Sequence, residues 1–155
     1  MLVADPLEFL KRFFTPRTVF MEIGAGDCAL ALSAASYVER VYAVEVGEFP
    51  GRAKLPGNLR LLPAEGIAQD SVDIAYSARP SLRGTAQLAK ILRSLAPGGT
   101  FVCAVREYAP SELREVFLQS GFRAVRLYGA VAGRFVRVPF AMEKLFRNAR
   151  VAAIK

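Results

Sequence analysis

Met21-Glu22-Ile23-Gly24-Ala25-Gly26-Asp27-Cys28-Ala29 is the stretch of sequence that decides the fold. It joins an apolar run at residues 18–23, which predicts a strand buried on both faces, to an Ala- and Leu-rich run at residues 27–38, which predicts a helix. Glycines at such a turn let the chain reverse sharply and let a ligand approach the backbone. Because ligands bind outside the carboxyl ends of parallel strands, the stretch predicts a ligand site at the sheet edge.

Strands and helices alternate along the rest of the chain, which indicates parallel strands joined by crossover connections. Strands are expected at residues 40–46, 58–62, 72–77, 100–105, 122–128 and 151–155. Helices are expected at residues 6–14, 81–95 and 110–120, and a turn at residues 96–99 leads into the fifth strand. Residues 129–148 are harder to assign: 134–138 alternate like a strand, and 142–147 have a helical pattern.

Bulk properties predict one cytoplasmic domain over residues 1–155. The chain is 53% hydrophobic, which excludes disorder, and it has neither a signal-peptide pattern nor an apolar run of the ~20 residues that span a bilayer. It has no His, and its two Cys lack the spacing of a metal site, so no metal is expected. The net charge is +7, and residues 106–155 hold ten Lys and Arg against four acids. Such a bias could attract nucleic acid, an anionic small molecule or an acidic partner, or it could form a solvated Arg-rich surface.

Two carboxylates indicate which ligand the glycine turn binds. Glu45 ends the second expected strand, about twenty residues after the glycines, where an acid accepts hydrogen bonds from ribose hydroxyls. Gly24-x-Gly26-x-x-Ala29 also fits the dinucleotide fingerprint, but Glu22 at the end of a buried strand needs a cationic partner, and Asp27 would repel a pyrophosphate. S-adenosylmethionine carries an ammonium group and no pyrophosphate, so the residues favour this cofactor over a nicotinamide dinucleotide.

The order of motifs resembles the class I S-adenosylmethionine-dependent methyltransferases, especially the bacterial type 11 group. Residues 22–27 resemble the family's first motif, Glu45 its ribose-binding acid, Glu65-Gly66 its adenine-facing pair, and residues 92–100 its Leu-x-Pro-Gly-Gly turn. The resemblance implies a three-layer Rossmann-like sandwich with a mostly parallel seven-stranded sheet, order 3-2-1-4-5-7-6, the last strand antiparallel. It also implies S-adenosylhomocysteine as product and the following cofactor-binding residues: Glu22, Gly24, Ala25, Gly26, Asp27, Glu45, Val46, Glu65, Gly66 and Ser77.

The acceptor side departs from the family. The segment after the fourth strand is short and lacks the family's frequent Glu-His pair, and little sequence separates the fifth strand from the next helix. We therefore expect residues 1–14 and 129–148, a second subunit or a large acceptor to close the site. No catalytic base is assigned. The candidate bases near the strand ends are Tyr76, Glu107 and Tyr108, and the residues that could hold an anionic acceptor are Arg79, Arg83 and Arg106.

The sequence is compatible with three functions. The family resemblance favours a methyltransferase acting on a small organic molecule. The basic last third and the short acceptor region are also compatible with RNA or protein as acceptor. The short acceptor region is also compatible with a non-catalytic cofactor-binding or partner subunit. In each case the chain could form a homo-oligomer or associate with a partner subunit.

Overall fold

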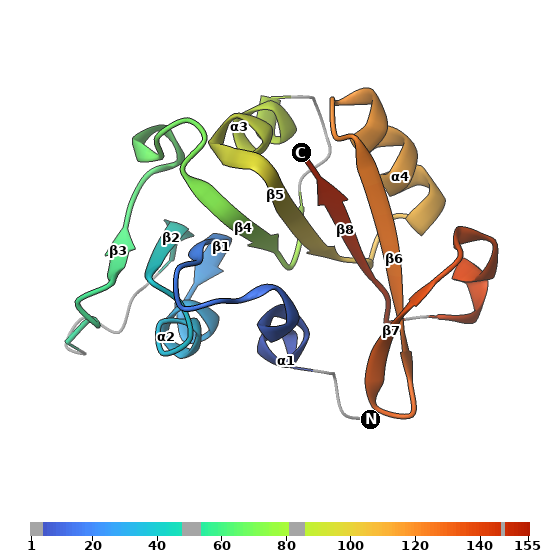
Figure 1. The fold of residues 1–155 in the computed structure, drawn as a ribbon, viewed down its shortest axis with the longest axis horizontal. Coiled ribbons are helices and arrows are strands. Elements are labelled where there is room, and N and C mark those ends of the chain that lie inside the picture. Colours follow the sequence, from blue (N-terminus) through green and yellow to red (C-terminus); the bar gives the residue numbers. More distant parts are fainter. Residues whose placement is uncertain (1–4, 48–53, 81–85, 147) are drawn as a thin grey trace.

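The computed structural model describes residues 5–47, 54–80, 86–146 and 148–155, and within them eight strands form one sheet (Figure 1). The strand order across the sheet is β3-β2-β1-β4-β5-β8-β6-β7. The strands are β1 Val19–Gly26, β2 Arg40–Val46, β3 Leu59–Leu61, β4 Val72–Ser77, β5 Leu95–Ala104, β6 Ala124–Val131, β7 Arg134–Val138 and β8 Arg150–Ile154.

Strand directions match the expected class of fold. The first five strands are parallel, and β8 runs antiparallel between β5 and β6. The Rossmann-like α/β class and the antiparallel last strand are therefore confirmed, but the predicted count of seven strands is wrong. The eighth strand is β7, which pairs with β6 as a hairpin at the sheet edge. Ala132 and Gly133 both have positive φ, of 48° and 77°, as a tight two-residue hairpin turn requires.

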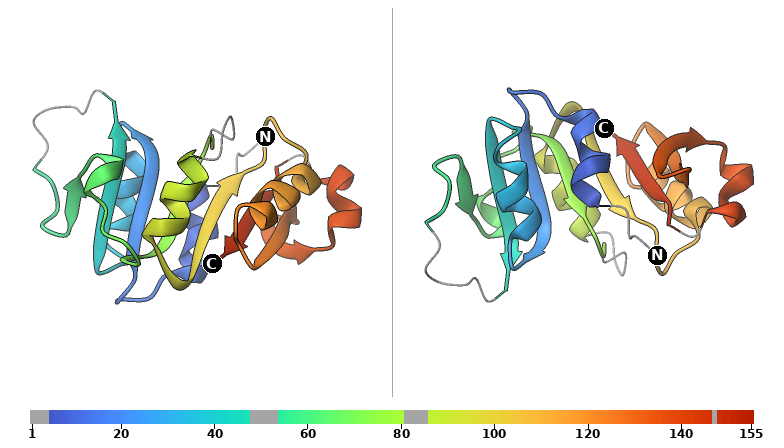
Figure 2. Two further views of the ribbon diagram at one scale, coloured as in Figure 1. Left: turned by 90° about the horizontal axis from the view of Figure 1, so that it is seen from above. Right: turned by 90° about the horizontal axis from the view of Figure 1, so that it is seen from below.

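Helices cover both faces of the sheet, giving three layers (Figure 2). The first face carries α1 Pro6–Leu10, followed by η1 Lys11–Phe13, and α2 Ala29–Ala34. The second face carries α3 Ala86–Ser94 and α4 Pro110–Gln119. Two short 3-10 helices, η2 Ala64–Gly66 and η3 Phe140–Leu145, lie in the connections before β4 and before β8. No helix in the described part of the chain is long and apolar enough to cross a membrane.

Apolar side chains point alternately to the two faces of the central strands and form two hydrophobic cores, one beneath each helical layer. On β1, Phe20 packs on the side of α1 and α2, whereas Met21 and Ile23 pack on the side of α3 and α4. On β5, Val102 and Phe101 divide in the same way. Because strand side chains point alternately to opposite faces, the uninterrupted apolar runs predicted at β1 and β5 serve both cores.

The N-terminal helix is fastened to the β6–β7 hairpin on the first face. The Phe9 ring is fully buried, and its centroid lies 5.2 Å from that of Tyr128 and 4.9 Å from that of Phe135. The Arg12 guanidinium donates a 3.1 Å hydrogen bond to the backbone carbonyl of Phe135. Two segments 123 residues apart in the chain therefore form one wall of the molecule.

Candidate functional site

The turn between β1 and α2 has an unusual backbone. Gly24, Gly26 and Cys28 have φ of 70°, 56° and 62°, in the left-handed region that few residues other than glycine adopt. The turn is held by two hydrogen bonds: the Cys28 N–H donates to the Ala25 carbonyl at 2.8 Å, and the Ala29 N–H donates to Asp27 Oδ1 at 3.0 Å. Residues held in sparsely populated conformations cluster at ligand sites, so the turn is a candidate binding loop.

Glu45, near the end of β2, faces this turn. Its own φ is 56°, and its Oε2 oxygen lies 4.0 Å from the position that a Cβ on Gly24 would occupy. The Gly47 N–H donates to the Gly26 carbonyl at 3.0 Å, which fixes the ends of β1 and β2 side by side. An exposed carboxylate and a bare glycine backbone therefore border the same space at the carboxyl edge of the sheet.

The Glu22 side chain points to the first face of the sheet, beneath α2. The residue is 8% exposed, and its Oε2 oxygen has no hydrogen-bond partner among the described residues. Burial raises the pKa of Glu22 to about 7, and the nearby Asp27 carboxylate raises it further, while a hydrogen bond from the Ala31 backbone opposes both. A buried carboxyl oxygen without a partner is energetically unfavourable unless a ligand supplies a cation or a hydrogen-bond donor.

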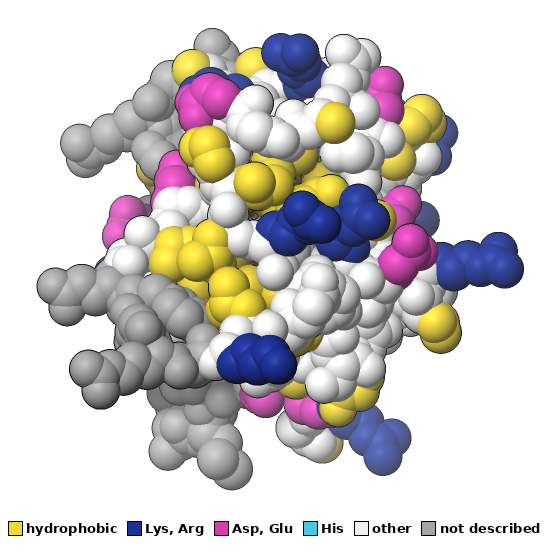
Figure 3. Space-filling model, turned by 90° about the vertical axis from the view of Figure 1, so that its left-hand side faces the viewer, with side chains coloured by type: hydrophobic (Ala, Val, Ile, Leu, Met, Phe, Trp, Pro, Cys, Tyr) yellow, Lys and Arg dark blue, Asp and Glu magenta, His cyan; other side chains and the backbone are white. Residues whose placement is uncertain are grey.

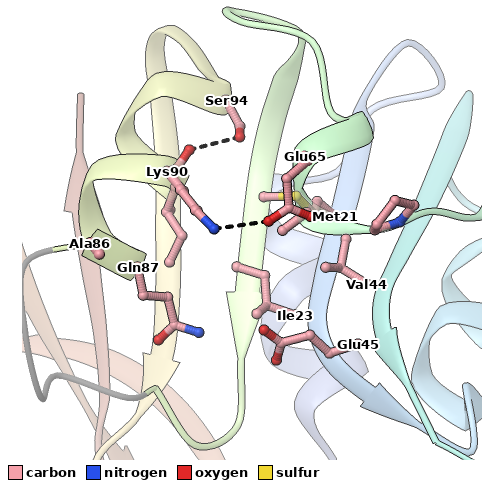
Figure 4. Close-up of a pocket in the computed structure, with 12 residues that line it drawn as sticks. Met21, Ile23, Val44, Glu45, Glu65, Ala86, Gln87, Lys90 and Ser94 are labelled. Carbon is pink, nitrogen blue, oxygen red and sulfur yellow. Dashed lines mark hydrogen bonds and ion pairs between the residues drawn. The ribbon is translucent and has the colours of Figure 1, made fainter.

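A cavity of about 700 Å³ lies on the second face of the sheet, between η2 and α3 (Figure 4). Glu45 reaches into it from the end of β2, Glu65 from η2, and Gln87 and Lys90 from α3. Its floor is apolar and includes Met21, Ile23, Val44 and Ile91. Figure 3 looks onto the β3 edge and shows hydrophobic side chains gathered near the centre of that face, with Lys and Arg side chains next to them. The volume lies within the ~300–1,000 Å³ of small-molecule sites.

An ion pair spans this cavity. Lys90 Nζ lies 2.9 Å from Glu65 Oε1, and the hydrogen bond from Lys90 is the main cause that lowers the pKa of Glu65. Sequence patterns could not identify Lys90 because it lies on a helix 25 residues away. The Glu65 carboxylate is thus held in place and stays charged at neutral pH.

The remaining predicted cofactor residues lie at the same edge of the sheet but differ in orientation. Val46 pairs with Gly26, and Ser77 is buried where β4 pairs with Ile23 of β1. Ala25 packs into the first core, so that only its backbone faces the turn. Gly66 lies in η2 and does not line the cavity, and its N–H donates to the Pro63 carbonyl.

A second, smaller cavity of about 230 Å³ opens at the carboxyl ends of β4 and β5. It is lined by Ala78, Arg79, Pro80, Ala104, Arg106, Glu107 and Tyr108. Four of the residues proposed for the acceptor side therefore lie together: Arg79, Arg106, Glu107 and Tyr108. Tyr76 does not line the cavity: it is buried in the first core, and burial raises the pKa of its phenol. Arg83 lies outside the described residues.

This strand order and these helical layers identify the fold. The chain has the class I methyltransferase fold. A solved S-adenosylmethionine-dependent methyltransferase from Aquifex aeolicus superposes with a TM-score of 0.72 at 18% identity, covering 98% of this chain and 90% of that one. The 1,6-didemethyltoxoflavin-N1-methyltransferase of Burkholderia thailandensis, solved with bound 1,6-didemethyltoxoflavin and S-adenosylhomocysteine, gives 0.67 at 19% identity, covering 98% and 79%.

A nucleic-acid enzyme shares the same architecture. The tRNA (m1A58) methyltransferase TrmI from Aquifex aeolicus superposes with a TM-score of 0.67 at 16% identity, covering 100% of this chain and 70% of that one. No protein-family model and no curated protein matches the sequence. Because these structural neighbours differ in what they act on, the shared fold by itself does not select an acceptor.

Proposed function

We propose that this chain is an S-adenosylmethionine-dependent methyltransferase that acts on a small organic molecule. The observation that carries the proposal is the unpartnered, buried oxygen of Glu22 behind a left-handed glycine turn, with the Glu45 carboxylate opposite that turn. An ammonium group, directly or through one water, would satisfy Glu22, and ribose hydroxyls would satisfy Glu45. A dinucleotide offers Glu22 no cation.

The residues present fit the cofactor. In this proposal Glu22 and the turn at Gly24, Ala25, Gly26 and Asp27 hold the amino-acid part, and Glu45 holds the ribose. The family resemblance assigns Val46, Glu65 and Gly66 to the adenine and Ser77 to the region of the reactive group, and of these four residues Glu65 lines the cavity. When bound, S-adenosylmethionine supplies an electrophilic methyl group, and S-adenosylhomocysteine is the product.

The protein's part in the chemistry is chiefly to position the acceptor. Holding two reactants in line contributes as much as ~7–11 kcal/mol to lowering a barrier. The 230 Å³ cavity beside β4 and β5 is where we place the acceptor. An acceptor that arrives protonated needs a base, and Glu107 and Tyr108 line that cavity, whereas the raised pKa of the buried Tyr76 keeps its phenol protonated.

Calorimetry with the purified chain tests this function. We expect S-adenosylmethionine and S-adenosylhomocysteine to bind and NADH not to bind. Binding of NADH without S-adenosylhomocysteine would instead indicate a nicotinamide-binding domain. Cofactor binding with no turnover on any acceptor, together with a co-purifying protein, would indicate a non-catalytic partner subunit.

RNA is the second candidate acceptor, favoured by one observation. The β6–β7 hairpin and its surroundings carry exposed arginines at positions 126, 134 and 137. Phosphate contacts by such residues make binding strongly salt-dependent. RNA binding that falls steeply between 50 mM and 200 mM salt would support this candidate, and the absence of RNA binding would remove it.

A further inference from the structure

Charged side chains divide the carboxyl edge of the sheet into two halves. Of the acids in one half, Asp27 follows β1 and Glu45 lies near the end of β2, whereas Glu22 lies within β1. Three arginines, Arg79, Arg106 and Arg150, lie at the ends of β4 and β5 and at the start of β8. Because β8 is antiparallel, its first residue lies at the edge where the parallel strands end. The proposed cofactor is cationic and would occupy the acidic half, which leaves the basic half to its reaction partner.

Arg150 is the residue of this group that sequence patterns did not identify. It is 6% exposed and pairs in register with Ala104, which lines the smaller cavity, and with Tyr128. Its guanidinium carbon lies 5.4 Å from the centre of the Phe135 ring, and its Nη1 donates to the Ala149 carbonyl at 3.3 Å. Phe135 and the Ala149 carbonyl therefore position this guanidinium, and Arg150 itself neighbours Ala104 of the cavity wall.

The electrostatic effects on these groups agree with this position. Burial is the main cause that lowers the pKa of Arg150, and the positive charge of Arg106 lowers it further. Arg150 and Arg106 both act to lower the pKa of Tyr76, against the effect of its burial. The two guanidinium groups thus act on the same region at the end of β4. Positive potential in a partly enclosed space attracts anions.

We propose that the methyl acceptor is a small organic anion, bound through its carboxylate by Arg79 and Arg106, with Arg150 adding positive charge beside the cavity. This inference rests on the proposed function and names its substrate class. Among the described residues, two guanidinium groups and one carboxylate, that of Glu107, line the cavity, so this part of its wall has a net positive charge. Guanidinium groups bind carboxylates through paired, charge-assisted hydrogen bonds.

The size of the cavity favours a small anion over a polymer. Its volume of about 230 Å³ lies below the ~300–1,000 Å³ typical of sites for drug-sized ligands. RNA recognition normally relies on an extended basic surface with aromatic side chains for stacking. Tyr108 is the single aromatic side chain among the residues that line this cavity.

Benzoate and its neutral analogue benzamide provide the test, each titrated by calorimetry into protein saturated with S-adenosylhomocysteine. We expect benzoate to bind and benzamide to bind at least about tenfold more weakly, since one charge-assisted contact is lost. Arg79→Gln and Arg106→Gln should each weaken benzoate binding about tenfold and leave S-adenosylhomocysteine binding within about twofold of the unmodified protein. Arg93→Gln is the matched control, because Arg93 is an exposed arginine in the last turn of α3, before the opposite end of β5.

Three results would overturn this inference: equal binding of benzoate and benzamide, loss of S-adenosylhomocysteine affinity in Arg106→Gln, or displacement of benzoate by a single-stranded RNA. The second result would assign the arginine to the cofactor's own carboxylate, and the third would assign the cavity to a nucleic-acid phosphate. If the unmodified chain binds no S-adenosylhomocysteine, the proposed function fails. If it binds S-adenosylhomocysteine but not benzoate, only the anionic acceptor is rejected.

Discussion

The Oε2 oxygen of Glu45 lies 4.0 Å from the point where a Cβ of Gly24 would be. Both residues have left-handed backbone conformations, and they belong to neighbouring parallel strands. The absence of a side chain on Gly24 therefore keeps the space in front of the carboxylate open. A ribose that bonded to Glu45 would pass directly over the Gly24 backbone, and this arrangement makes the two positions interdependent.

Replacing Glu45 with Ala tests the ribose contact. We expect Glu45→Ala to weaken S-adenosylhomocysteine binding by roughly 1–3 kcal/mol, because the ribose hydroxyls would lose their acceptor. Isothermal titration calorimetry measures the change. Glu39→Ala removes an exposed carboxylate just before the same strand and should leave the affinity unchanged. Equal affinities for the two variants would mean that the ribose lies elsewhere.

Substitutions at two glycines with similar backbone conformations can distinguish the effect of backbone strain from the effect of blocked cofactor binding. Gly26 has φ 56° and Gly133 has φ 77°, and a Cβ added to either would meet no heavy atom within 4 Å. Gly26→Val and Gly133→Val should therefore destabilise the fold similarly, by at least ~1–2 kcal/mol. Only Gly26→Val should abolish S-adenosylhomocysteine binding, since its side chain would fill the ligand's path. Retained binding in folded Gly26→Val protein would contradict the placement.

The raised pKa of Glu22 predicts a pH dependence of stability. Burial raises this pKa from 4.5 to about 7, so the folded chain holds the proton more tightly than the unfolded chain. The free energy of unfolding should therefore fall as pH rises from about 4.5 to about 7 and level off above that. Glu22→Gln removes the ionisable group and should be more stable than the unmodified protein at pH 8, by up to about 3 kcal/mol, with no difference at pH 4. Urea unfolding at both pH values measures this, and a constant difference between the two proteins would rule out the buried carboxyl as its cause.

Cofactor affinity should respond to the same group in the opposite direction. An ammonium group binds the ionised form of Glu22, so affinity for S-adenosylhomocysteine should rise as pH increases from 6 to 8. Glu22→Gln should bind more weakly at pH 8 and show little dependence on pH over this range. A parallel rise in both proteins would place the ammonium group away from Glu22.

The N-terminal helix should contribute strongly to stability through one ring. Phe9 is fully buried against Phe13, Tyr128 and Phe135. Phe9→Ala should lower the free energy of unfolding by about 3–5 kcal/mol, whereas Phe13→Ala, at a partly buried position, should cost clearly less. Equal losses measured by urea unfolding would show that the Phe9 contacts do not anchor the helix.

Local patterns were sufficient to predict the central strands. The bounds predicted for β2 and β4, residues 40–46 and 72–77, match the structure because each is an apolar run ended by turn-forming residues. The bounds predicted for the first long helix, 27–38, are wrong, since α2 spans only Ala29–Ala34. Its start is delayed by the left-handed Cys28, and beyond its end the Asn58 side chain donates to the carbonyls of Ala35 and Val38. A side chain more than twenty residues along the chain fixes that end, so helix propensity could not predict it.

The predicted turn at residues 96–99 is partly confirmed. The structure continues β5 back to Leu95, but the pairing with β4 jumps from Val72↔Leu95 to Ile74↔Thr100 across this segment. Gly98 has φ 78°, and a Cβ on Gly99 would lie 2.8 Å from the Ala96 carbonyl oxygen. The bend predicted from these glycines is therefore present, although it interrupts β5 instead of preceding it.

In the candidate site, too, local sequence patterns could indicate some residues, whereas others are brought there only by the tertiary structure. Glu22, Gly24 and Glu45 belong to β1 and β2, whose positions local sequence patterns predict, so the sequence alone could single them out as candidates. Lys90 and Arg150 approach from a helix and from an antiparallel strand, and only the assembled sheet brings them to the site. The edge strand β7 was also missed in the count of strands, although residues 134–138 have strand-like alternation.

If the proposed function holds, the short connection between β3 and β4 leaves room for altered methyl donors. Among the described residues of that connection, the three-residue η2 borders the cavity of about 700 Å³, whose opposite side is formed by α3. A donor whose adenine amino group carries an alkyl substituent would find an apolar floor there instead of a packed helix. Donors enlarged in this way should therefore remain usable, which would make the chain a starting point for labelling its own acceptor selectively in a mixture.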